Sequence, residues 1–310
     1  MPEPFDSVLM IGYGGPEKMD DVRPFLDNVL RGKHVSPERV EEVVGHYECV
    51  GGKSPFNEWT FRQAAALEAR LSETGDPLPV RVGTRNWTPR LADTLAAMAR
   101  DGRRRAVGVI MAPHQCQTSF EQYQENVAEA REQGGPAAPR VDYIEPWFDD
   151  PGYIEAVADR VTTCFERIPE WDRPKTELIF SAHSIPHRMA DASPYVEQLT
   201  TSARRVAERL GHGRWSLAYQ SRSGRPEDPW LEPDVCDVLT KRAAQGLRLA
   251  VVVPIGFLCD HVEVIYDLDK EARDRARASG LTMFRAGTVA DHPKFIDALA
   301  GRVRALVETA

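Results

Sequence analysis

The sequence predicts an α/β protein of two lobes, each a parallel sheet flanked by helices. Short apolar runs alternate with amphipathic helical patterns from one end to the other, an order typical of parallel sheets with helical crossovers. The length of 310 residues suits one large domain or two ordinary lobes. The Gly- and Pro-rich stretch Gly134–Pro139 offers a linker. We therefore expect lobes over residues 1–140 and 141–310, with the last helix free to pack on the first lobe.

The individual elements follow from apolar runs and from helical periodicity. In the first half, strands are expected at Ser7–Gly12, Pro79–Val82 and Ala106–Met111. The helices of that half are expected at Met19–Leu30, Ser36–Tyr47, Trp59–Ser72 and Leu91–Ala99. In the second half, strands are expected at Glu177–Ser181, Trp215–Tyr219, Leu249–Ile255 and Thr282–Arg285. Its helices are expected at Tyr153–Glu166, Tyr195–Leu210, Cys236–Gln245, His261–Ala278 and Pro293–Val307.

Composition argues against nucleic acid and membranes as partners. Acidic residues outnumber basic ones by 47 to 39, and a formal charge of −8 disfavours binding to phosphate backbones or anionic lipid surfaces. The longest apolar run, Leu249–Cys259, is interrupted by Pro254 and Gly256 and is too short to span a bilayer. We expect no nucleic-acid partner and no stable membrane insertion.

The cysteines and the N-terminus indicate a cytoplasmic protein. The five cysteines lie far apart without any CxxC motif, so neither a disulfide framework nor an iron–sulfur cluster is supported by local spacing. Residues 1–7 contain neither a basic region nor a long apolar run, so a secretory signal is not expected.

Parallel sheets bind their ligands beyond the carboxyl ends of the strands, so residues directly after the expected strands are the first site candidates. This rule selects Tyr13, His114, His183, Gln220 and the segment Cys259–Glu271.

His183 lies in the turn after the apolar strand that begins at Glu177, and Pro186 prevents the chain from continuing at once as a helix. A neutral imidazole at this place could accept a proton or bind a metal near pH 7. A turn histidine that is hydrogen-bonded to the backbone explains the position equally well.

An acidic stripe is expected on the helix after residue 261. Glu263, Asp267 and Glu271 recur every four residues, and such like-charged pairs repel by roughly 0.2–0.5 kcal/mol each. A stripe that holds or passes a cation would offset this cost. The alternative is a capping box formed by Asp260 and Glu263, with Lys270 neutralising the stripe.

Two glycine-rich turns resemble phosphate-binding loops only superficially. Gly12–Pro16 is not a GxGxxG motif, and it suits a plain strand-to-helix turn in which Tyr13 is a lining aromatic or a weak oxygen ligand. Gly51–Pro55 ends like a P-loop, but the leading glycine of that pattern would fall at Tyr47. Nucleotide binding, and with it a nucleotide-dependent oxidoreductase, is therefore not expected.

Nine segments, in order along nearly the whole chain, together resemble the ferrochelatase family. They are Gly12–Pro16, Arg31-Gly32, His46–Pro55, Ala112–His114, Ser181–Pro186, Ser193–Tyr195 with Gln198, Tyr219–Ser221, Pro229–Leu231 and Pro254–Glu263. The resemblance implies two Rossmann-like lobes with a porphyrin cleft between them. It is nearest to the bacterial branch that metallates coproporphyrin III, in which a tyrosine like Tyr13 occupies the first strand-to-helix turn, whereas the protoporphyrin branch typically has Asn-Leu-Gly there.

The resemblance also implies roles for the titratable candidates. His183 and Glu263 would be catalytic, lying on one side of the ring, where they accept pyrrole protons or handle the incoming iron. Asp267 and Glu271 would join them in binding the metal, as the outer part of a cation route.

Substrate-binding residues are likewise implied by the resemblance. Tyr13 would face the opposite side of the ring near the axial position of the metal. Arg31 and Ser54 would hold propionates, and Tyr123 and Trp230 would contact the ring, as would Trp87.

Three positions depart from the pattern of close relatives. His46 stands where they have an arginine and Asn86 where they have a histidine, so propionate binding through residue 46 is in doubt. Cys259 replaces a small residue, and we interpret it as a packed thiol rather than a metal contact.

The expected activity is insertion of Fe²⁺ into coproporphyrin III to give coproheme. Fe²⁺ is then a substrate, and no cofactor or iron–sulfur cluster is expected. We also expect a monomer and a transient partner enzyme that accepts coproheme. The alternatives are a protoporphyrin IX ferrochelatase, a cobalt or nickel chelatase for another tetrapyrrole, and a non-catalytic porphyrin or haem carrier.

Overall fold

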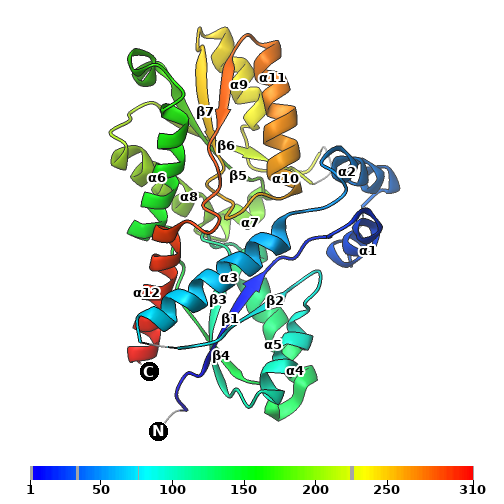
Figure 1. Ribbon diagram of the computed structural model, residues 1–310. Coiled ribbons are helices and arrows are strands. Elements are labelled where there is room, and N and C mark those ends of the chain that lie inside the picture. The colour runs from blue at the N-terminus through cyan, green and yellow to red at the C-terminus, as the bar shows by residue number, and fades with distance from the viewer. Residues whose placement is uncertain (1–2, 33–34, 76, 224–226, 310) are drawn as a thin grey trace. The chain divides into compact units, whose positions relative to one another are not determined.

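The computed structural model describes residues 3–32, 35–75, 77–223 and 227–309 (Figure 1). The chain forms two compact units. Unit 1 comprises Met1–Met111, Thr118–Pro146 and Ile296–Ala310, and unit 2 comprises Ala112–Gln117 and Trp147–Phe295. The expected linker, Gly134–Pro139, lies inside unit 1, where it ends one helix and leads through a 3-10 turn into a strand. Most of the last helix also belongs to unit 1.

Unit 1 contains a four-stranded parallel sheet with the order β2-β1-β3-β4. Its strands are β1 (Ser7–Gly12), β2 (Val80–Thr84), β3 (Arg105–Ile110) and β4 (Arg140–Tyr143). Every residue of β1 is buried, as expected of a strand covered on both faces. The edge strand β4 was not predicted, because its four residues, Arg-Val-Asp-Tyr, contain no apolar run; the first is exposed and the other three are half-buried.

Unit 2 repeats this topology, with the order β6-β5-β7-β8. Its strands are β5 (Glu177–His183), β6 (Trp215–Gln220), β7 (Leu249–Val253) and β8 (Thr282–Arg285). His183 is in register with Gln220, the last residue of β6. Because all four strands are parallel, the ends of β5, β6 and β8 lie along one edge of the sheet.

Helices connect the strands in the predicted order. Those of unit 1 are α1 (Met19–Val29), α2 (Pro37–Cys49), α3 (Phe56–Glu73), α4 (Leu91–Arg100), the π-helical η1 (Gln117–Glu121) and α5 (Gln122–Gly134), with η2 (Gly135–Ala137) following as a 3-10 turn. Ser36 begins α2 by accepting a hydrogen bond from the Arg39 amide, with Pro37 at the first helical position. The stretch Gln117–Gly134 was not predicted as helical, since its sequence is largely polar and shows little apolar periodicity.

The helices of unit 2 are α6 (Pro151–Phe165), α7 (His187–Asp191), α8 (Tyr195–Arg209), α9 (Val235–Ala244), α10 (Val262–Val264), the π-helical η4 (Ile265–Ala272) and α11 (Arg273–Ala278), with a 3-10 turn, η3 (Glu170–Lys175), before β5. The final helix is α12 (Pro293–Thr309). The single α-helix expected over 261–278 is therefore a helical run whose centre is a π-helix.

The hydrophobic core of unit 2 fixes that run on the sheet. Val264 and Leu268 are fully buried and pack in one cluster with Ile179 of β5, Val252 of β7 and Leu239 of α9. Glu263 and Asp267, which directly precede these two residues, are thereby held at the carboxyl edge of the sheet, because the apolar positions are committed to the core.

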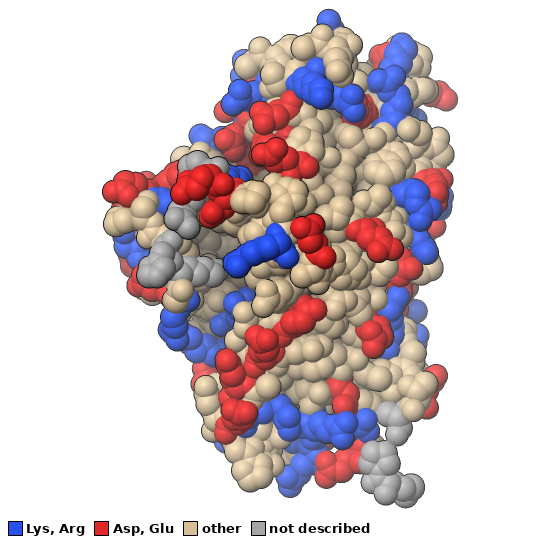
Figure 2. Space-filling view, turned by 180° about the vertical axis from the view of Figure 1, so that it is seen from behind, with Lys and Arg blue, Asp and Glu red and all other residues tan. Residues whose placement is uncertain are grey.

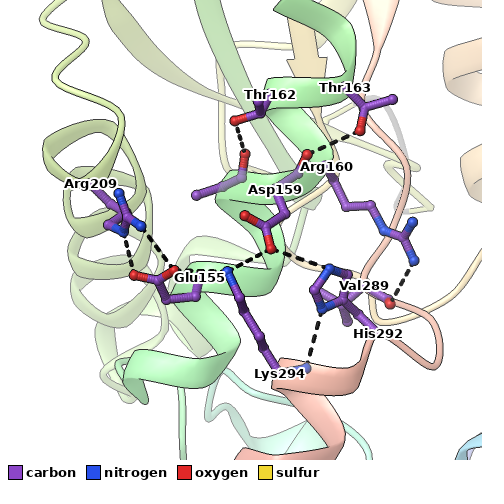
Figure 3. Close-up of polar contacts among 10 residues, drawn as sticks. Glu155, Asp159, Arg160, Thr162, Thr163, Arg209, Val289, His292 and Lys294 are labelled. Carbon is purple, nitrogen blue, oxygen red and sulfur yellow. Dashed lines mark hydrogen bonds and ion pairs between the residues drawn. The ribbon is translucent and has the colours of Figure 1, made fainter.

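Charged side chains are interspersed over the face shown in Figure 2, and several form ion pairs. In unit 2, Glu155 of α6 accepts hydrogen bonds from Arg209 of α8 and, at 3.0 Å, from Lys294 at the start of α12. Asp159 pairs with Lys294 at 2.7 Å and with His292 at 3.4 Å (Figure 3). These contacts fasten the first turn of α12 to α6.

Candidate active site

His183 is held at the end of β5 by two backbone contacts. Its Nδ1 donates to the Ser184 carbonyl, because a carbonyl oxygen can only accept. In the neutral form of the ring, this contact places the proton on Nδ1 and the lone pair on Nε2. The Tyr195 hydroxyl donates to the His183 carbonyl at 3.0 Å, which fixes the backbone at the same point.

The structure brings His183 and Glu263 together. His183 Nε2 lies 3.7 Å from Glu263 Oε1, and the side chains are 31% and 39% exposed. Burial alone would lower the pKa of His183, but the Glu263 carboxylate and the bond to Ser184 outweigh it and raise that pKa. An imidazole and a carboxylate, both reachable from solvent, therefore face one another at the carboxyl edge.

Glu263 lies between two imidazoles. The Glu263 amide donates to His261 Nδ1 at 3.3 Å, so His261 caps α10, and the same nitrogen lies 4.0 Å from Glu263 Oε2. Burial lowers the pKa of His261, which favours the neutral ring. The capping-box interpretation is wrong, because the Asp260 carboxylate binds Arg285 and Thr288 instead.

Asp267 lies one turn further along η4, facing β6. It is buried and accepts hydrogen bonds from the Ser221 hydroxyl and, at 3.4 Å, from Gln220 Nε2. Burial and, next, the negative charge of Glu263 raise the pKa of Asp267 to about 7, although the Ser221 bond opposes the shift. Ser221 has a φ of 59°, an uncommon value for a non-glycine residue, and it donates its hydroxyl to Asp267 from this backbone conformation.

Glu271 is exposed near the end of η4. Its negative charge contributes to the raised pKa of Asp267, so the two carboxylates are within electrostatic reach. Among the described residues, no three His, Cys, Asp or Glu side chains are grouped as a preformed metal site. The four predicted metal-binding residues thus differ in burial, with Asp267 buried, His183 and Glu263 half-buried and Glu271 exposed, and they do not form a closed cage.

Trp230 is held close to His183 by backbone pairing. Pro186 and Trp230 form an antiparallel bridge, and the Ser184 hydroxyl donates to the Leu231 carbonyl at 2.8 Å. Trp230 lines a cavity of about 560 Å³ in unit 2 together with Ser184, Tyr219 and several acidic side chains. The predicted ring-contacting tryptophan therefore borders a cavity next to the histidine turn.

Tyr13 belongs to an aromatic cluster at the carboxyl edge of the unit 1 sheet. It lies edge-on to Phe25 and Phe56, with ring centroids 6.2 and 6.4 Å apart. Trp87 and Tyr47 extend the cluster through Phe25. The backbone carbonyl of Tyr13 accepts a hydrogen bond from the backbone N–H of Asn86 at 3.0 Å.

The other substrate-binding candidates of unit 1 occupy different environments. Arg31 is exposed and donates to Asn28 Oδ1 at 2.9 Å. Ser54 is buried, and its hydroxyl accepts a hydrogen bond from the Phe56 amide. Tyr123 is also buried, with the guanidinium of Arg85 5.9 Å from its ring centre. Of these three side chains, Arg31 is exposed on the surface of its unit, whereas Ser54 and Tyr123 are buried.

Two candidates selected by position are packed side chains. His114 is buried, bonds to Ser202 Oγ at 2.9 Å through Nε2, and lies edge-on to Tyr153 and Tyr195. Burial lowers the pKa of His114 to about 3, so the ring stays neutral. Cys259 is buried, and burial raises the pKa of its thiol, in line with a packed thiol.

Two residues that shape this site lay in segments that the sequence analysis singled out, but were given no role there. His261 directly follows the predicted Asp260 cap, and Tyr195 begins α8. His261 was visible as a second imidazole two residues before Glu263. The bond from Tyr195 to the His183 carbonyl has no local sequence signal, because it joins separate elements.

No helix among the described residues is both long and apolar enough to cross a membrane.

Comparisons with known proteins agree on one family. The family model described as Ferrochelatase matches residues 6–306. A ferrochelatase of Rhodopirellula baltica is 45% identical over 302 residues, which cover 97% of this chain and 86% of that protein. A coproporphyrin III ferrochelatase of Streptomyces griseus is 42% identical over 316 residues, covering 96% of this chain and 84% of that protein. In fold, the chain is similar to SirB from Bacillus subtilis with Fe³⁺, with a TM-score of 0.62, 13% identity, and coverage of 98% of this chain and 96% of that one.

Proposed function

Because the chain belongs to the ferrochelatase family and is thus a metal-chelating lyase, we propose that it inserts Fe²⁺ into coproporphyrin III and releases coproheme. The observation that carries this proposal is the approach of His183 Nε2 to Glu263 Oε1, at 3.7 Å, on the carboxyl edge of the unit 2 sheet.

The chemistry of metal insertion matches these two groups. Two pyrrole protons must leave the macrocycle, and the metal must exchange its water ligands for ring nitrogens. With Nδ1 committed to the Ser184 carbonyl, His183 presents Nε2 as a base or a metal ligand. The Glu263 carboxylate can stabilise the imidazolium that forms, or accept the second proton. Both groups can also bind a divalent metal transiently.

Asp267 and Glu271 are proposed to deliver the cation. Exposed Glu271 would meet hydrated Fe²⁺ first, and buried Asp267 would bind it after losing its proton. Since the pKa of Asp267 is raised to about 7, this carboxyl group exchanges its proton close to neutral pH. A group of that kind binds a cation without holding it as firmly as a permanently ionised cage would.

Ring binding is assigned mainly to aromatic and basic side chains. We propose that Tyr13 and Trp230 contact the macrocycle and that exposed Arg31 pairs with a propionate by charge-assisted hydrogen bonds. Binding energy of this kind can be used to distort the flat ring so that its nitrogen lone pairs face the metal. For Ser54 and Tyr123, which are buried in unit 1, ring contact stays a prediction.

The choice of coproporphyrin III is supported by Tyr13 and by the relatives. Several proteins about 42% identical to this chain are named coproporphyrin III ferrochelatase, whereas the one at 45% identity is named ferrochelatase alone. We further propose a cytoplasmic monomer without a cofactor that passes coproheme to an accepting enzyme.

A rate comparison tests the substrate assignment. The purified protein is supplied anaerobically with Fe²⁺ and with either coproporphyrin III or protoporphyrin IX, and initial rates are followed by absorbance. We expect faster turnover of coproporphyrin III. Faster turnover of protoporphyrin IX would overturn the substrate assignment while leaving the reaction type intact.

A further inference from the structure

Arg285 is the last residue of β8, and each N–H group of its guanidinium has an acceptor within reach. Nε donates to Asp269 Oδ1 at 2.9 Å, and Nη2 lies 2.8 Å from Asp269 Oδ2. Nη1 and Nη2 bind the two oxygens of Asp260 at 3.1 and 3.0 Å, and Nη1 also reaches the Ala286 carbonyl at 3.4 Å. Five N–H groups thus meet five acceptor contacts, which is the fork geometry that only arginine provides.

The two carboxylates that Arg285 joins flank the acidic stripe. Asp260 precedes Glu263 by three residues, and Asp269 follows Asp267 by two. Residues two apart on a helix do not face the same way, so Asp267 and Asp269 reach different neighbours. Asp267 contacts Gln220 and Ser221 at the end of β6, whereas Asp269 contacts Arg285 at the end of β8.

β6 and β8 are the two outer strands of the unit 2 sheet. The helical run from α10 through η4 is therefore attached at both sides of the sheet by polar contacts, and between them by Val264 and Leu268 in the core. Apolar packing alone tolerates small rotations of a helix about its axis. The bidentate contacts of Arg285 restrict this rotation, because they fix one carboxylate before the run and one inside its π-helical part.

We propose that Arg285 is a positioning residue for the cation route: by clamping Asp260 and Asp269 it sets the rotation of the π-helix and thereby the direction of Glu263, Asp267 and Glu271. This inference rests on the proposed function for its kinetic test but not for its metal-binding test. Arg285 itself touches neither iron nor porphyrin. Its side chain is 14% exposed, so the clamp acts from beneath the surface.

Removing the guanidinium leaves Asp260 and Asp269 as neighbouring carboxylates. Thr288 donates one hydrogen bond to Asp260, and Arg273, which is 54% exposed, reaches Asp269 at 2.9 Å. Neither contact joins the two aspartates, so their repulsion would turn or loosen the π-helix. The expected consequence is weaker metal capture with little change in porphyrin binding.

The test uses Arg285→Met and Arg285→Lys in the full-length protein. Fe²⁺ is varied at saturating coproporphyrin III, and the porphyrin is then varied at saturating Fe²⁺. Arg285→Met should raise the KM for Fe²⁺ by up to roughly 10-fold, the lower end of the range for losing a direct partner of a metal-binding side chain, because Arg285 acts through Asp260 and Asp269. The porphyrin KM should change less than about twofold. Arg285→Lys keeps the charge but not the fork, so it should restore part of the loss.

Arg242→Met is the matched control. Arg242 binds buried Glu177 at 3.0 Å, and Glu177 also accepts from Ser216, at the amino edge of the same sheet. This variant loses a comparable bridge far from the stripe and should leave both KM values unchanged. If Arg285→Met does not fold, the double variant Asp269→Asn/Arg285→Gln takes its place. It lacks the bidentate clamp, so the KM for Fe²⁺ should still rise, but by less than in Arg285→Met because the repulsion between the two aspartates is also removed.

Calorimetric titration of each protein with Co²⁺ alone, without porphyrin, separates this inference from the proposed function. Weaker Co²⁺ binding by Arg285→Met but not by Arg242→Met supports the clamp even if the wild-type protein inserts no iron. A folded Arg285→Met protein with wild-type Co²⁺ affinity and wild-type KM for Fe²⁺ overturns it. Equal increases of both KM values would also overturn it, since they indicate a general loss of structure.

Discussion

The two sheets share one topology but differ at their carboxyl edges. β1 and β5 occupy the same place in the orders β2-β1-β3-β4 and β6-β5-β7-β8. Tyr13 follows β1 and joins a cluster of aromatic rings, whereas His183 ends β5 and faces Glu263. The strand scaffold therefore does not decide the chemistry, which is determined by the residues placed directly after the strands.

A second contrast lies within unit 2. At the amino edge of its sheet, Glu177 is buried and bound by Arg242 and Ser216. At the carboxyl edge, burial and, next, the negative charge of Glu263 raise the pKa of Asp267. The charge of Glu177 is thus paired at the amino edge, whereas Asp267 is destabilised in its ionised form at the edge where we expect the reaction.

The largest effect is expected from His183→Ala. Loss of the base should lower the rate of iron insertion by roughly 10²–10⁴-fold, as is typical of a positioned proton acceptor. Initial anaerobic rates with coproporphyrin III measure it, with circular dichroism as a check on folding. His212→Ala is the matched control, since His212 bonds to the Thr176 carbonyl at the amino edge of the same strand and should keep its activity. A folded His183→Ala protein with the wild-type rate would contradict the assignment of the reaction to the carboxyl edge of the unit 2 sheet.

A smaller effect is expected from Tyr13→Leu in unit 1. The aromatic edge is assigned to ring binding, so the KM for coproporphyrin III should rise by about tenfold, which corresponds to about 1.4 kcal/mol. Co²⁺ affinity in the absence of porphyrin should not change. A Tyr13→Leu protein with weaker Co²⁺ binding and an unchanged porphyrin KM would contradict the assignment of ring binding to the carboxyl edge of unit 1 and of metal binding to that of unit 2.

The pH dependence of metal binding should follow Asp267. The folded pKa is raised to about 7, so Co²⁺ affinity should increase between pH 6 and 8 as the carboxyl group loses its proton, and Asp267→Asn should flatten that increase. Calorimetric titrations at several pH values measure it. An unchanged pH profile in Asp267→Asn would assign the titration to another group.

The same shift has a consequence for stability. A raised folded pKa favours the protonated form, so the stabilisation is present below the unfolded pKa of about 3.9 and is lost as the pH rises through about 7. The Asp267→Asn variant has no carboxyl group to titrate at this position, so it does not lose this stabilisation. The free energy of unfolding of the variant minus that of the wild type should therefore increase from pH 5 to pH 8. Urea denaturation at the two pH values tests the sign, and a relative decrease would contradict it.

The smallest effect is expected from Glu155→Gln in the ion network between α6 and α12. Arg209 and, next, Lys294 lower the pKa of Glu155 to about 2, so its contribution is present at neutral pH and is lost only as the pH falls towards 2. The residue is partly exposed, so the free energy of unfolding should fall by no more than about 1 kcal/mol at pH 7, with unchanged kinetics. Thermal unfolding and steady-state rates measure both, and a lower iron-insertion rate would give this network a role that its position does not suggest.

The sequence predicted what depends on local pattern and missed what depends on distant partners. The buried strands could be predicted because parallel strands are apolar on both faces, whereas polar β4 and the stretch Gln117–Gly134 gave no such pattern. The spacing of Glu263, Asp267 and Glu271 predicted a helical stripe but could not distinguish an α-helix from a π-helix.

The capping box failed for a related reason. Asp260 and Glu263 have the right spacing, yet Arg285, 25 residues further along, takes the Asp260 carboxylate. A local motif describes the bonds a residue can make, and tertiary contacts decide which of them form. Burial of Ser54, a predicted propionate contact, depends in the same way on the turn around it.

The central claim is tested most directly by an anaerobic time course of the wild-type protein with Fe²⁺ and excess coproporphyrin III. The account predicts multiple turnovers per protein, seen as the absorbance of the free porphyrin giving way to that of coproheme. Tight porphyrin binding without conversion would contradict it and would indicate a carrier built on the same fold.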